Sequence, residues 1–395
     1  MKKSYKEPFL CMALLTMMVF EVPFFNLFLL VGFLMLILYI VLYRRKMMVN
    51  AECLVLLLFV ILYFVIDTNL EYSNEYKFWY SMSAVSLYIC GYSMNYRLLN
   101  KEERSQKIEY VIRIIAMAYI AYIIITVAYS AAKGQFSISR NPLNLWTGVY
   151  RAATHYGTMS VIPLAYGLYL AIVSEKKREC CLGWILVVFT ALVAIITASR
   201  TILLLVPVGA VIAFFVNIGM RGKLSVKHIR QFVGALTLIG FVVIVFSVDL
   251  FGARTLFLKS PLGQRYLHGD APTLVEDGRW KHLEFFAHNI KKSIWGGGYT
   301  RLRAGNLHNI YLNVLDLSGI FPFVLLLVFT WQVIRDYQRM RKNGAVTVSA
   351  ALLLLLVLSL SFIQMFIEPV MESVPVFFWC ILMICGMQCG VSRCT

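Results

Sequence analysis

The sequence predicts an all-α protein that crosses a membrane about twelve times and carries one large extracytoplasmic loop. Of its 395 residues, 60% are hydrophobic and 14% are charged, whereas soluble proteins average about 45–50% and about 25%. Apolar runs long enough to cross a bilayer, about 20 residues each, recur along the whole chain. The charged residues lie mostly between these runs. Together these observations exclude a soluble globular protein.

The apolar runs define twelve expected spans and three parts. The first run is not a cleaved signal peptide, because the second follows almost at once and no small-residue cleavage site separates them. The parts are 1–249 with spans one to nine, a large extracytoplasmic loop at 250–308, and 309–395 with spans ten to twelve. The expected spans are 9–24, 25–43, 51–67, 78–96, 108–130, 155–174, 182–198, 201–219, 231–249, 309–334, 345–367 and 375–391.

The basic residues set the expected orientation. In a soluble chain, 37 Lys and Arg against 20 Asp and Glu would indicate a nucleic-acid binder. Here basic clusters at 2–6, 44–46 and 176–178 fall in alternate gaps, whereas the short gaps on the other side hold only Lys77. Basic gaps face the cytoplasm. We therefore expect both termini to be cytoplasmic and no nucleic acid among the partners.

Cysteine and histidine placement predicts neither a disulfide framework nor a metal site. None of the nine cysteines falls in an expected outer loop. His282 and His288 are six residues apart, so they do not share a helical face. We expect no cofactor, although a metal site stays open among the cysteines near the C-terminus, where free thiols more often act as small buried apolar groups. These are Cys380, Cys385, Cys389 and Cys394.

The expected outer loop, 250–308, is the most polar part of the chain and is net basic. A cationic surface beside a membrane suits an anionic ligand delivered in the lipid phase, such as a polyprenyl diphosphate. The glycines at 296–298 are compatible with a phosphate-binding nest, or with no more than a turn. The basic residues are Arg254, Lys259, Arg265, Arg279, Lys281, Lys291, Lys292, Arg301 and Arg303, against Asp270, Glu276, Asp277 and Glu284.

Three further arginines fall at expected outer-face positions. Arg140 and Arg151 precede span six, and Arg200 lies between spans seven and eight. An ionisable residue in so apolar a stretch indicates a functional site, because burying its charge is costly. The alternative is that Arg200 extends its charge to the interface.

Span ten opens with the candidate base, His308. Asn309, Asn313 and Asp316 lie within one narrow stripe of the expected helix, with His308 at its mouth. Histidine is the side chain best suited to accept a proton near neutral pH. A histidine at a helix end can also simply contact interfacial water. His155 is a weaker candidate base, four residues after Arg151, or an interfacial polar residue.

Three segments resemble the O-antigen ligase/polymerase superfamily of bacterial envelope polysaccharide assembly. The stretch 197–207 resembles the family's arginine at a paired-span junction, and Gly278-Arg279-Trp280 with the later Trp-Gly-Gly-Gly resembles its outer-loop elements. His308-Asn309, nine residues and then Gly319 are similar to the ligase pattern. That pattern continues with Gly, Thr or Tyr at the position of Pro322, so this chain departs from it there.

The resemblance implies a metal-independent inverting glycosyltransferase in the bacterial inner membrane. Its donor would be an undecaprenyl-diphosphate-linked oligosaccharide, and a chain-length regulator would be a further partner. By resemblance, Arg200 and Arg279 would bind the diphosphate, with Arg151 or Arg140 beside them, and His308 would activate the acceptor hydroxyl.

We expect a polymerase that joins repeat units of a surface polysaccharide such as O-antigen or capsule. A ligase that transfers the finished glycan to lipid A core or another anchor is the nearest alternative. A transporter of lipid-linked oligosaccharide would show internal repeats and charges deep within several spans, which the sequence does not show convincingly. A sensor or scaffold would not need Arg200 and His308 at one membrane level.

Overall fold

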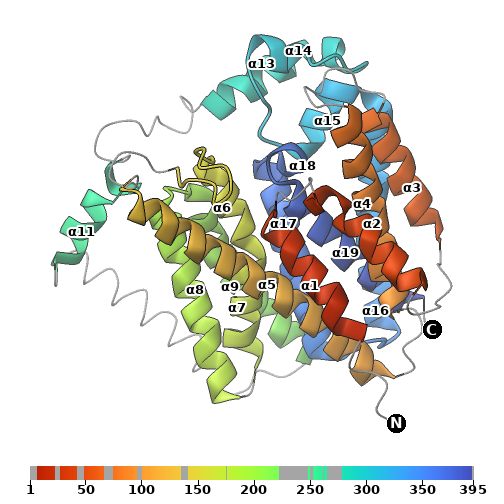
Figure 1. Cartoon of the computed structure of the whole chain (residues 1–395), viewed down its shortest axis with the longest axis horizontal. Helices are drawn as coiled ribbons and strands as arrows, with labels where there is room; N and C mark the ends of the chain where they lie inside the picture. The colour runs from red at the N-terminus through yellow and green to blue at the C-terminus, as the bar shows by residue number, and fades with distance from the viewer. Residues whose placement is uncertain are drawn as a thin grey trace. The chain divides into compact units, whose positions relative to one another are not determined.

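The computed structural model describes residues 7–22, 27–41, 49–65, 74–95, 100–134, 141–174, 176–221, 248–249, 252–260, 262–264 and 278–393. Within these ranges the protein is almost entirely α-helical and has no β-strand, only an isolated bridge between Leu143 and Tyr150 (Figure 1). The predicted all-α class is therefore confirmed.

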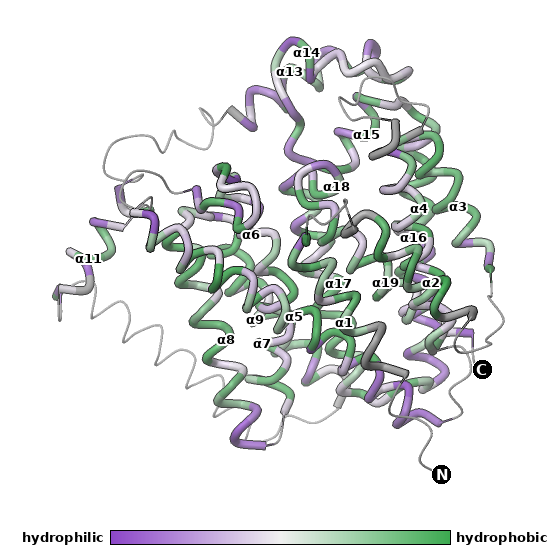
Figure 2. Tube along the Cα trace, viewed as in Figure 1, coloured by the Kyte–Doolittle hydropathy of each residue, from purple (hydrophilic) through white to green (hydrophobic). Residues whose placement is uncertain are grey.

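Seven helical segments in the described ranges are long and apolar enough to cross a membrane. They overlap predicted spans five to eight and ten to twelve, so the chain is a multi-pass membrane protein by this criterion. Figure 2 shows these helices as predominantly apolar tubes. The segments are α5 (Lys101–Ala132), α6 (Ala153–Met159) continued by α7 (Val161–Val173), α8 (Lys177–Ile196), α9 (Arg200–Arg221), α16 (Ile320–Lys342), α17 (Val348–Ile367) and α19 (Pro375–Ser392).

Helices also form at predicted spans one to four, but they do not meet that criterion. The first three, α1 (Glu7–Val19), α2 (Leu27–Val41) and α3 (Ala51–Val60), have 13, 15 and 10 residues. A π-helical turn, η2 (Ile61–Val65), extends α3, and α4 (Asn74–Asn95) is long but less apolar. Predicted span nine, 231–249, lies outside the described residues except for 248–249. Twelve spans remain a prediction.

The chain forms two compact units. The first comprises Met1–Ala118, Thr273–Leu354 and Ser361–Thr395, and the second comprises Tyr119–Pro272 and Leu355–Leu360. Each unit therefore combines segments that are distant in sequence. The predicted division into 1–249, 250–308 and 309–395 separates membrane spans from an outer loop, and these units do not test it.

In the first unit, α19 packs closely against α4. A Cβ added to Gly91 would lie 2.1 Å from the Met383 carbonyl oxygen, and one added to Gly386 would lie 2.1 Å from that of Tyr88. Small residues allow membrane helices to approach this closely. Since every residue of α19 is buried, it is a central helix of the first unit.

In the second unit, α7 packs against α8 in the same way. A Cβ on Gly183 would lie 2.3 Å from the Ala171 backbone nitrogen. All residues of α7 are buried, and α9 also packs against α7, where Gly209 approaches Leu168. Within each unit, glycines thus let two helices approach more closely than larger apolar side chains would allow.

Predicted span ten, 309–334, is not one continuous helix. It divides into α15 (Ile310–Ser318) and α16, separated by Gly319 at φ +86°. Backbone groups of the preceding loop take the hydrogen bonds that a continuous helix would use. Gly297 N donates to the Leu317 carbonyl at 2.8 Å, and Ile320 N donates to the Ile294 carbonyl at 2.8 Å. The prediction of one continuous helix over 309–334 is wrong. The loop that interrupts this helix meets it only in the folded chain, so the local sequence pattern does not show the break.

The described part of the predicted outer loop is itself helical. It contains α11 (Ala253–Lys259), α13 (Gly278–Ser293) and α14 (Tyr299–Arg303), while 265–277 lie outside the described residues. Part of the apolar side of α13 is covered, because Phe286 packs with Leu307 and Leu315. This packing places the start of α13 beside the segment that carries His308.

Candidate functional site

A buried carboxylate at the end of α17 connects two of the predicted site residues. Arg279 Nη2 donates to Glu368 Oε1 at 2.6 Å, and His308 Nδ1 lies 3.3 Å from Glu368 Oε2. Glu368 is only 4% exposed, whereas the Arg279 and His308 side chains are 34% and 32% exposed. We call Arg279, Glu368 and His308 the Glu368 cluster.

The electrostatics of this cluster keep Glu368 ionised. Burial by itself would raise the pKa of Glu368, but the hydrogen bond with His308 and the charge of Arg279 outweigh burial and lower that pKa below its ordinary value. An ionised carboxylate only accepts hydrogen bonds, so Nδ1 of His308 donates to it. In neutral His308, Nε2 is then left with the lone pair that can accept a proton.

A second imidazole stacks on His308. The rings of His282 and His308 lie 6.5 Å apart, centroid to centroid, at an interplanar angle of 10°. His282 Nδ1 lies 3.0 Å from the Asn306 carbonyl oxygen and donates to it. Gly305 has φ +117°, and a Cβ there would lie 2.8 Å from Cε1 of His282. The loop before α15 therefore holds the His282 ring in place. His288 instead contacts the backbone of its own helix.

A second carboxylate lies four residues after Glu368, in the short helix α18 (Val370–Ser373). Glu372 accepts hydrogen bonds from Tyr63 at 2.7 Å, from Arg301 Nη1 at 3.1 Å and from Asn313 Nδ2. We call these four residues the Glu372 cluster. It joins η2, α14, α15 and α18 within the first unit.

The predicted stripe on span ten separates into three roles. Asn309 caps α15 by accepting from the backbone nitrogens of Tyr311 and Leu312. Asn313 binds Glu372. Asp316 is fully buried and accepts from the backbone nitrogens of Thr300 and Arg301 and from a serine hydroxyl of α13. Asp316 thus fixes α14 to α15.

The other predicted site residues belong to the second unit. Arg151 Nε donates to His155 Nδ1 at 3.1 Å, and Arg151 Nη1 donates to the Tyr122 hydroxyl at 3.2 Å. Because Nδ1 of His155 accepts this bond, its proton lies on Nε2, unlike the arrangement at His308. Arg200 is the first residue of α9. Arg140 lies outside the described residues.

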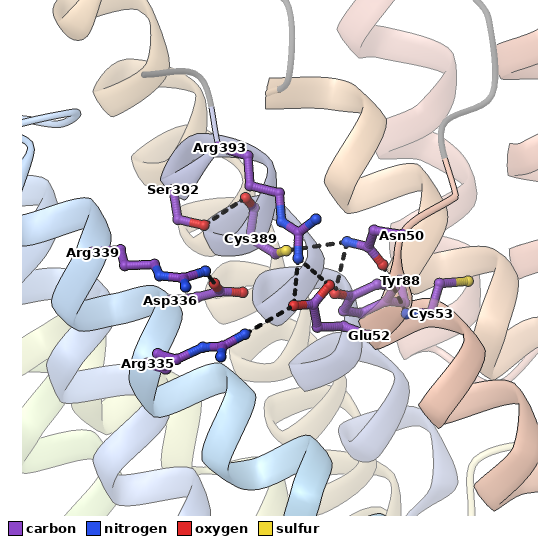
Figure 3. Close-up of polar contacts among 10 residues, drawn as sticks. All are labelled: Asn50, Glu52, Cys53, Tyr88, Arg335, Asp336, Arg339, Cys389, Ser392 and Arg393. Carbon is purple, nitrogen blue, oxygen red and sulfur yellow. Dashed lines mark hydrogen bonds and ion pairs between the residues drawn. The ribbon is translucent and has the colours of Figure 1, made fainter.

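One group of three side chains in the described part of the chain has the donor atoms and spacing for a metal ion. Glu52, Asp336 and Cys389 are buried, and one possible ligand atom from each lies within 4.8 Å of the others. Asn50 Nδ2 also donates to Cys389 Sγ at 3.2 Å. Figure 3 shows that these side chains come from three different helices and converge.

Guanidinium groups already balance these carboxylates. Arg393 Nη2 lies 2.5 Å from both oxygens of Glu52, and Arg335 Nη2 lies 3.9 Å from one of them (Figure 3). Arg339 Nη1 lies 4.0 Å from Asp336. We call these residues, with Cys389, the Glu52 cluster. It acts as an ion-pair network between α3, α16 and α19.

Sequence reasoning did not identify Glu368 and Glu372 as site residues. They served only as markers of an outer gap that lacks basic residues. A usable signal was present, because they are the only acidic residues between 345 and 391 and are four residues apart. Their partners, however, lie between 59 and 309 residues away in the sequence, and no local pattern predicts such pairs.

Comparisons with known proteins do not identify a family for this chain. No family model matches the chain, and no curated protein matches it. The family resemblance therefore remains an expectation, and the function proposed next is argued from the geometry of the Glu368 cluster.

Proposed function

We propose that this chain is a membrane-embedded inverting glycosyltransferase that polymerises undecaprenyl-diphosphate-linked repeat units of a surface polysaccharide. It would act on the outer face of the bacterial cytoplasmic membrane, with both termini in the cytoplasm. The observation that carries this proposal is the Glu368 cluster, in which a buried, ionised carboxylate holds His308 Nδ1 and leaves Nε2 to accept a proton.

In the proposed reaction, His308 Nε2 takes the proton of an acceptor sugar hydroxyl. The hydroxyl oxygen then forms a bond to the anomeric carbon of the donor, and the bond from that carbon to the diphosphate oxygen breaks. The electron pair leaves with undecaprenyl diphosphate, and the configuration at carbon inverts. Glu368 orients the imidazole and stabilises the imidazolium that forms.

Arginines are the proposed source of positive charge for the leaving diphosphate. Guanidinium groups match phosphate oxygens with two parallel hydrogen bonds and need no proton transfer, so no divalent metal is required. Arg200 and Arg151, with Arg140, are the proposed ligands of the second unit. In the first unit, Arg279 uses Nη2 to hold Glu368 while its side chain is 34% exposed, so we assign it both positioning and diphosphate contact.

The acceptor determines the difference between polymerase and ligase. We propose a second lipid-linked repeat unit as acceptor, with a chain-length regulator as a further partner. Transfer to lipid A core or another anchor would use the same base and the same arginines.

The base assignment is preferred over His155 for a geometric reason. His155 accepts a hydrogen bond from Arg151 at Nδ1 and therefore carries its proton on Nε2. It can accept a further proton only by losing that bond. His308 has no such conflict, because its Nδ1 donates to an anion.

A reconstituted assay tests the proposal. Full-length protein in vesicles would receive lipid-linked repeat units, with polymer measured by gel and donor affinity measured separately. We expect His308→Asn to abolish polymer while donor affinity stays within about three-fold, because general base catalysis contributes roughly 10²–10⁴-fold. His288→Asn is the matched control, since His288 is exposed and contacts its own helix. Polymer formation by His308→Asn at the wild-type rate would contradict the proposal.

A further inference from the structure

The segment from the last turn of α13 to the end of α14, residues 290–303, exposes bulky apolar side chains. Trp295 is 78% exposed and Leu302 is 81% exposed, and Ile290 is 41% exposed. Side chains of this size are rarely so exposed together unless they meet a partner or a membrane. We call residues 290–303 the tip.

Backbone hydrogen bonds fix the level of the tip relative to α16. Gly298 N donates to the Asp316 carbonyl at 2.8 Å, and Ile320 N donates to the Ile294 carbonyl at 2.8 Å. Trp295 therefore lies beside Gly319, where α16 begins. A Cβ on Gly319 would lie 2.8 Å from the Trp295 carbonyl carbon, so the contact is close and rigid.

The outward face of α16 is apolar from its first turn. Phe321, Val324 and Trp331 are 68%, 45% and 64% exposed, as expected of side chains that face lipid. The exposed Trp295 lies beside the start of this helix, because its backbone contacts Gly319. Tryptophan is enriched at the boundary between membrane and water, because its ring is apolar and its N–H is polar.

The tip is also strongly basic. Residues 290–303 contain Lys291, Lys292, Arg301 and Arg303 and no acidic residue. Arg301 pairs with Glu372, whereas Lys291, Lys292 and Arg303 are exposed. Lys292 Nζ donates to the Tyr299 hydroxyl at 2.9 Å, and the Arg303 guanidinium lies 5.2 Å from the same ring. Tyr299 therefore gathers two of these cations beside one another. Figure 2 shows polar and apolar residues alternating over α13 and α14.

We propose that the tip docks into the anionic headgroup layer of the leaflet at which α16 begins. Trp295 and Leu302 insert at the boundary with the acyl chains, and Lys291, Lys292 and Arg303 bind lipid phosphates. A soluble anionic partner would account for the cations but not for the two exposed apolar side chains. The position of Trp295 beside the start of α16 selects the membrane. This inference does not depend on the proposed reaction.

Docking would restrain the site. Asp316 joins the start of α14 to α15, and Arg301 of α14 holds Glu372. A membrane-bound tip therefore limits the motion of the loop that leads to His308. Its lipid contacts can be measured without any assay of catalysis.

Quenching of tryptophan fluorescence by brominated lipids tests the docking. The full-length protein would be reconstituted in vesicles of phosphatidylglycerol and phosphatidylcholine whose bromine atoms lie either near the headgroups or deep in the acyl chains. The difference between wild type and Trp295→Phe isolates the signal of Trp295. Trp331→Phe is the matched control, because Trp331 lies three turns further along the lipid-facing side of α16.

We expect shallow bromines to quench the Trp295 signal at least two-fold more than deep bromines, with the reverse order for Trp331. A Trp295 signal that bromolipids leave unchanged and aqueous acrylamide quenches would overturn the proposal.

The charge requirement has its own test. The variant Lys291→Gln/Lys292→Gln/Arg303→Gln should shift the docking equilibrium by roughly five-fold for each cation removed, the equivalent of about 1 kcal/mol each. Shallow quenching of Trp295 should fall accordingly, and should also fall for the wild type in vesicles of phosphatidylcholine alone. Equal shallow quenching in both lipid mixtures and in both proteins would overturn the assignment to anionic headgroups.

Discussion

Carboxylates lie near both ends of α19, and their partners differ. Before its first turn lie Glu368 and Glu372, and at its last turn lies the Glu52 cluster. The helix has 18 residues, so roughly 27 Å separate its ends. At one end the partners include an imidazole and at the other they are guanidinium groups and a thiol. Burial of a carboxylate alone does not identify a reactive site; the chemistry of its partners does.

The distinction follows from proton affinity. A guanidinium stays protonated at any physiological pH, so the pairs of Glu52 with Arg393 and Arg335 hold helices together but cannot exchange a proton. His308 differs, because its Nδ1 donates to Glu368 and its Nε2 then carries a lone pair that can accept a proton. We therefore assign chemistry to the Glu368 cluster and stability to the Glu52 cluster.

The largest expected effect is on turnover, and it comes from changing His308 in the Glu368 cluster. His308→Asn should lower turnover by roughly 10³-fold and leave the melting temperature within about 2 °C, because His308 is one-third exposed. Turnover and thermal unfolding of the same detergent-purified sample would be compared. A large fall in melting temperature with turnover preserved per folded molecule would reverse the assignment.

Arg393→Gln should produce the opposite result. It leaves Glu52, which is 2% exposed, without its closest cation. Removing one partner of a fully buried ion pair costs about 3–5 kcal/mol, and the loss here should be smaller because the Arg393 side chain is 33% exposed and Arg335 stays near Glu52. Thermal unfolding should show this loss, while turnover per folded molecule stays within about two-fold. The double variant Glu52→Gln/Arg393→Gln is the control and should recover much of the stability, because it buries no unpaired charge.

Glu368→Gln tests the role of the Glu368 charge within the Glu368 cluster. The amide keeps the size of the carboxyl group but removes the charge that orients His308 and stabilises its protonated form. We expect turnover to fall by roughly 10²-fold, less than for His308→Asn. Steady-state rates of the two variants at one pH would test this order. Glu284→Gln, at an exposed position of α13, should change the rate little.

A smaller effect is expected where Gly305 meets His282. A Cβ at Gly305 would lie 2.8 Å from the His282 ring at a φ of +117°, so Gly305→Ala must displace that ring or the loop. We expect about a three- to ten-fold loss of turnover, because the stacked ring only positions His308. Gly134→Ala is a control for backbone strain, since Gly134 also has positive φ but has open space around it. Equal losses of turnover in the two variants would remove His282 from the site.

The pH dependence of stability should reveal the ionisation of Glu368. The pKa of Glu368 is lower in the folded protein than in an unfolded chain, so its ionised form stabilises the fold. That contribution is complete above the ordinary glutamate pKa of about 4.3 and is lost as pH falls through the lower folded value. Unfolding curves for wild type and Glu368→Gln should therefore converge as the sample is acidified from pH 6 to about pH 3. Curves that stay parallel would contradict this linkage.

Several features were accessible from sequence because they depend on local pattern. Long apolar runs predict helices, and seven of the predicted spans meet the length and hydropathy expected of membrane helices. The same reasoning placed Arg279 and His308 among the site residues but could not pair them, because Glu368 follows His308 by 60 residues. Sequence reasoning also predicted one helix over 309–334. The break at Gly319 depends on hydrogen bonds with a preceding loop, and these form only in the folded chain.

The sequence by itself determined the environment of this protein, because hydropathy and helical length are properties of each segment alone. It determined that the chain is α-helical and suited to lipid, and that basic residues gather in 278–303. The tertiary structure alone decided which charges meet. In the folded chain, Glu368 meets a histidine of the loop before α15, and Glu52 of α3 meets one arginine of α16 and another that follows α19. Those contacts depend on segments far apart in the chain, and they determine which buried carboxylate supports a base and which one supports the fold.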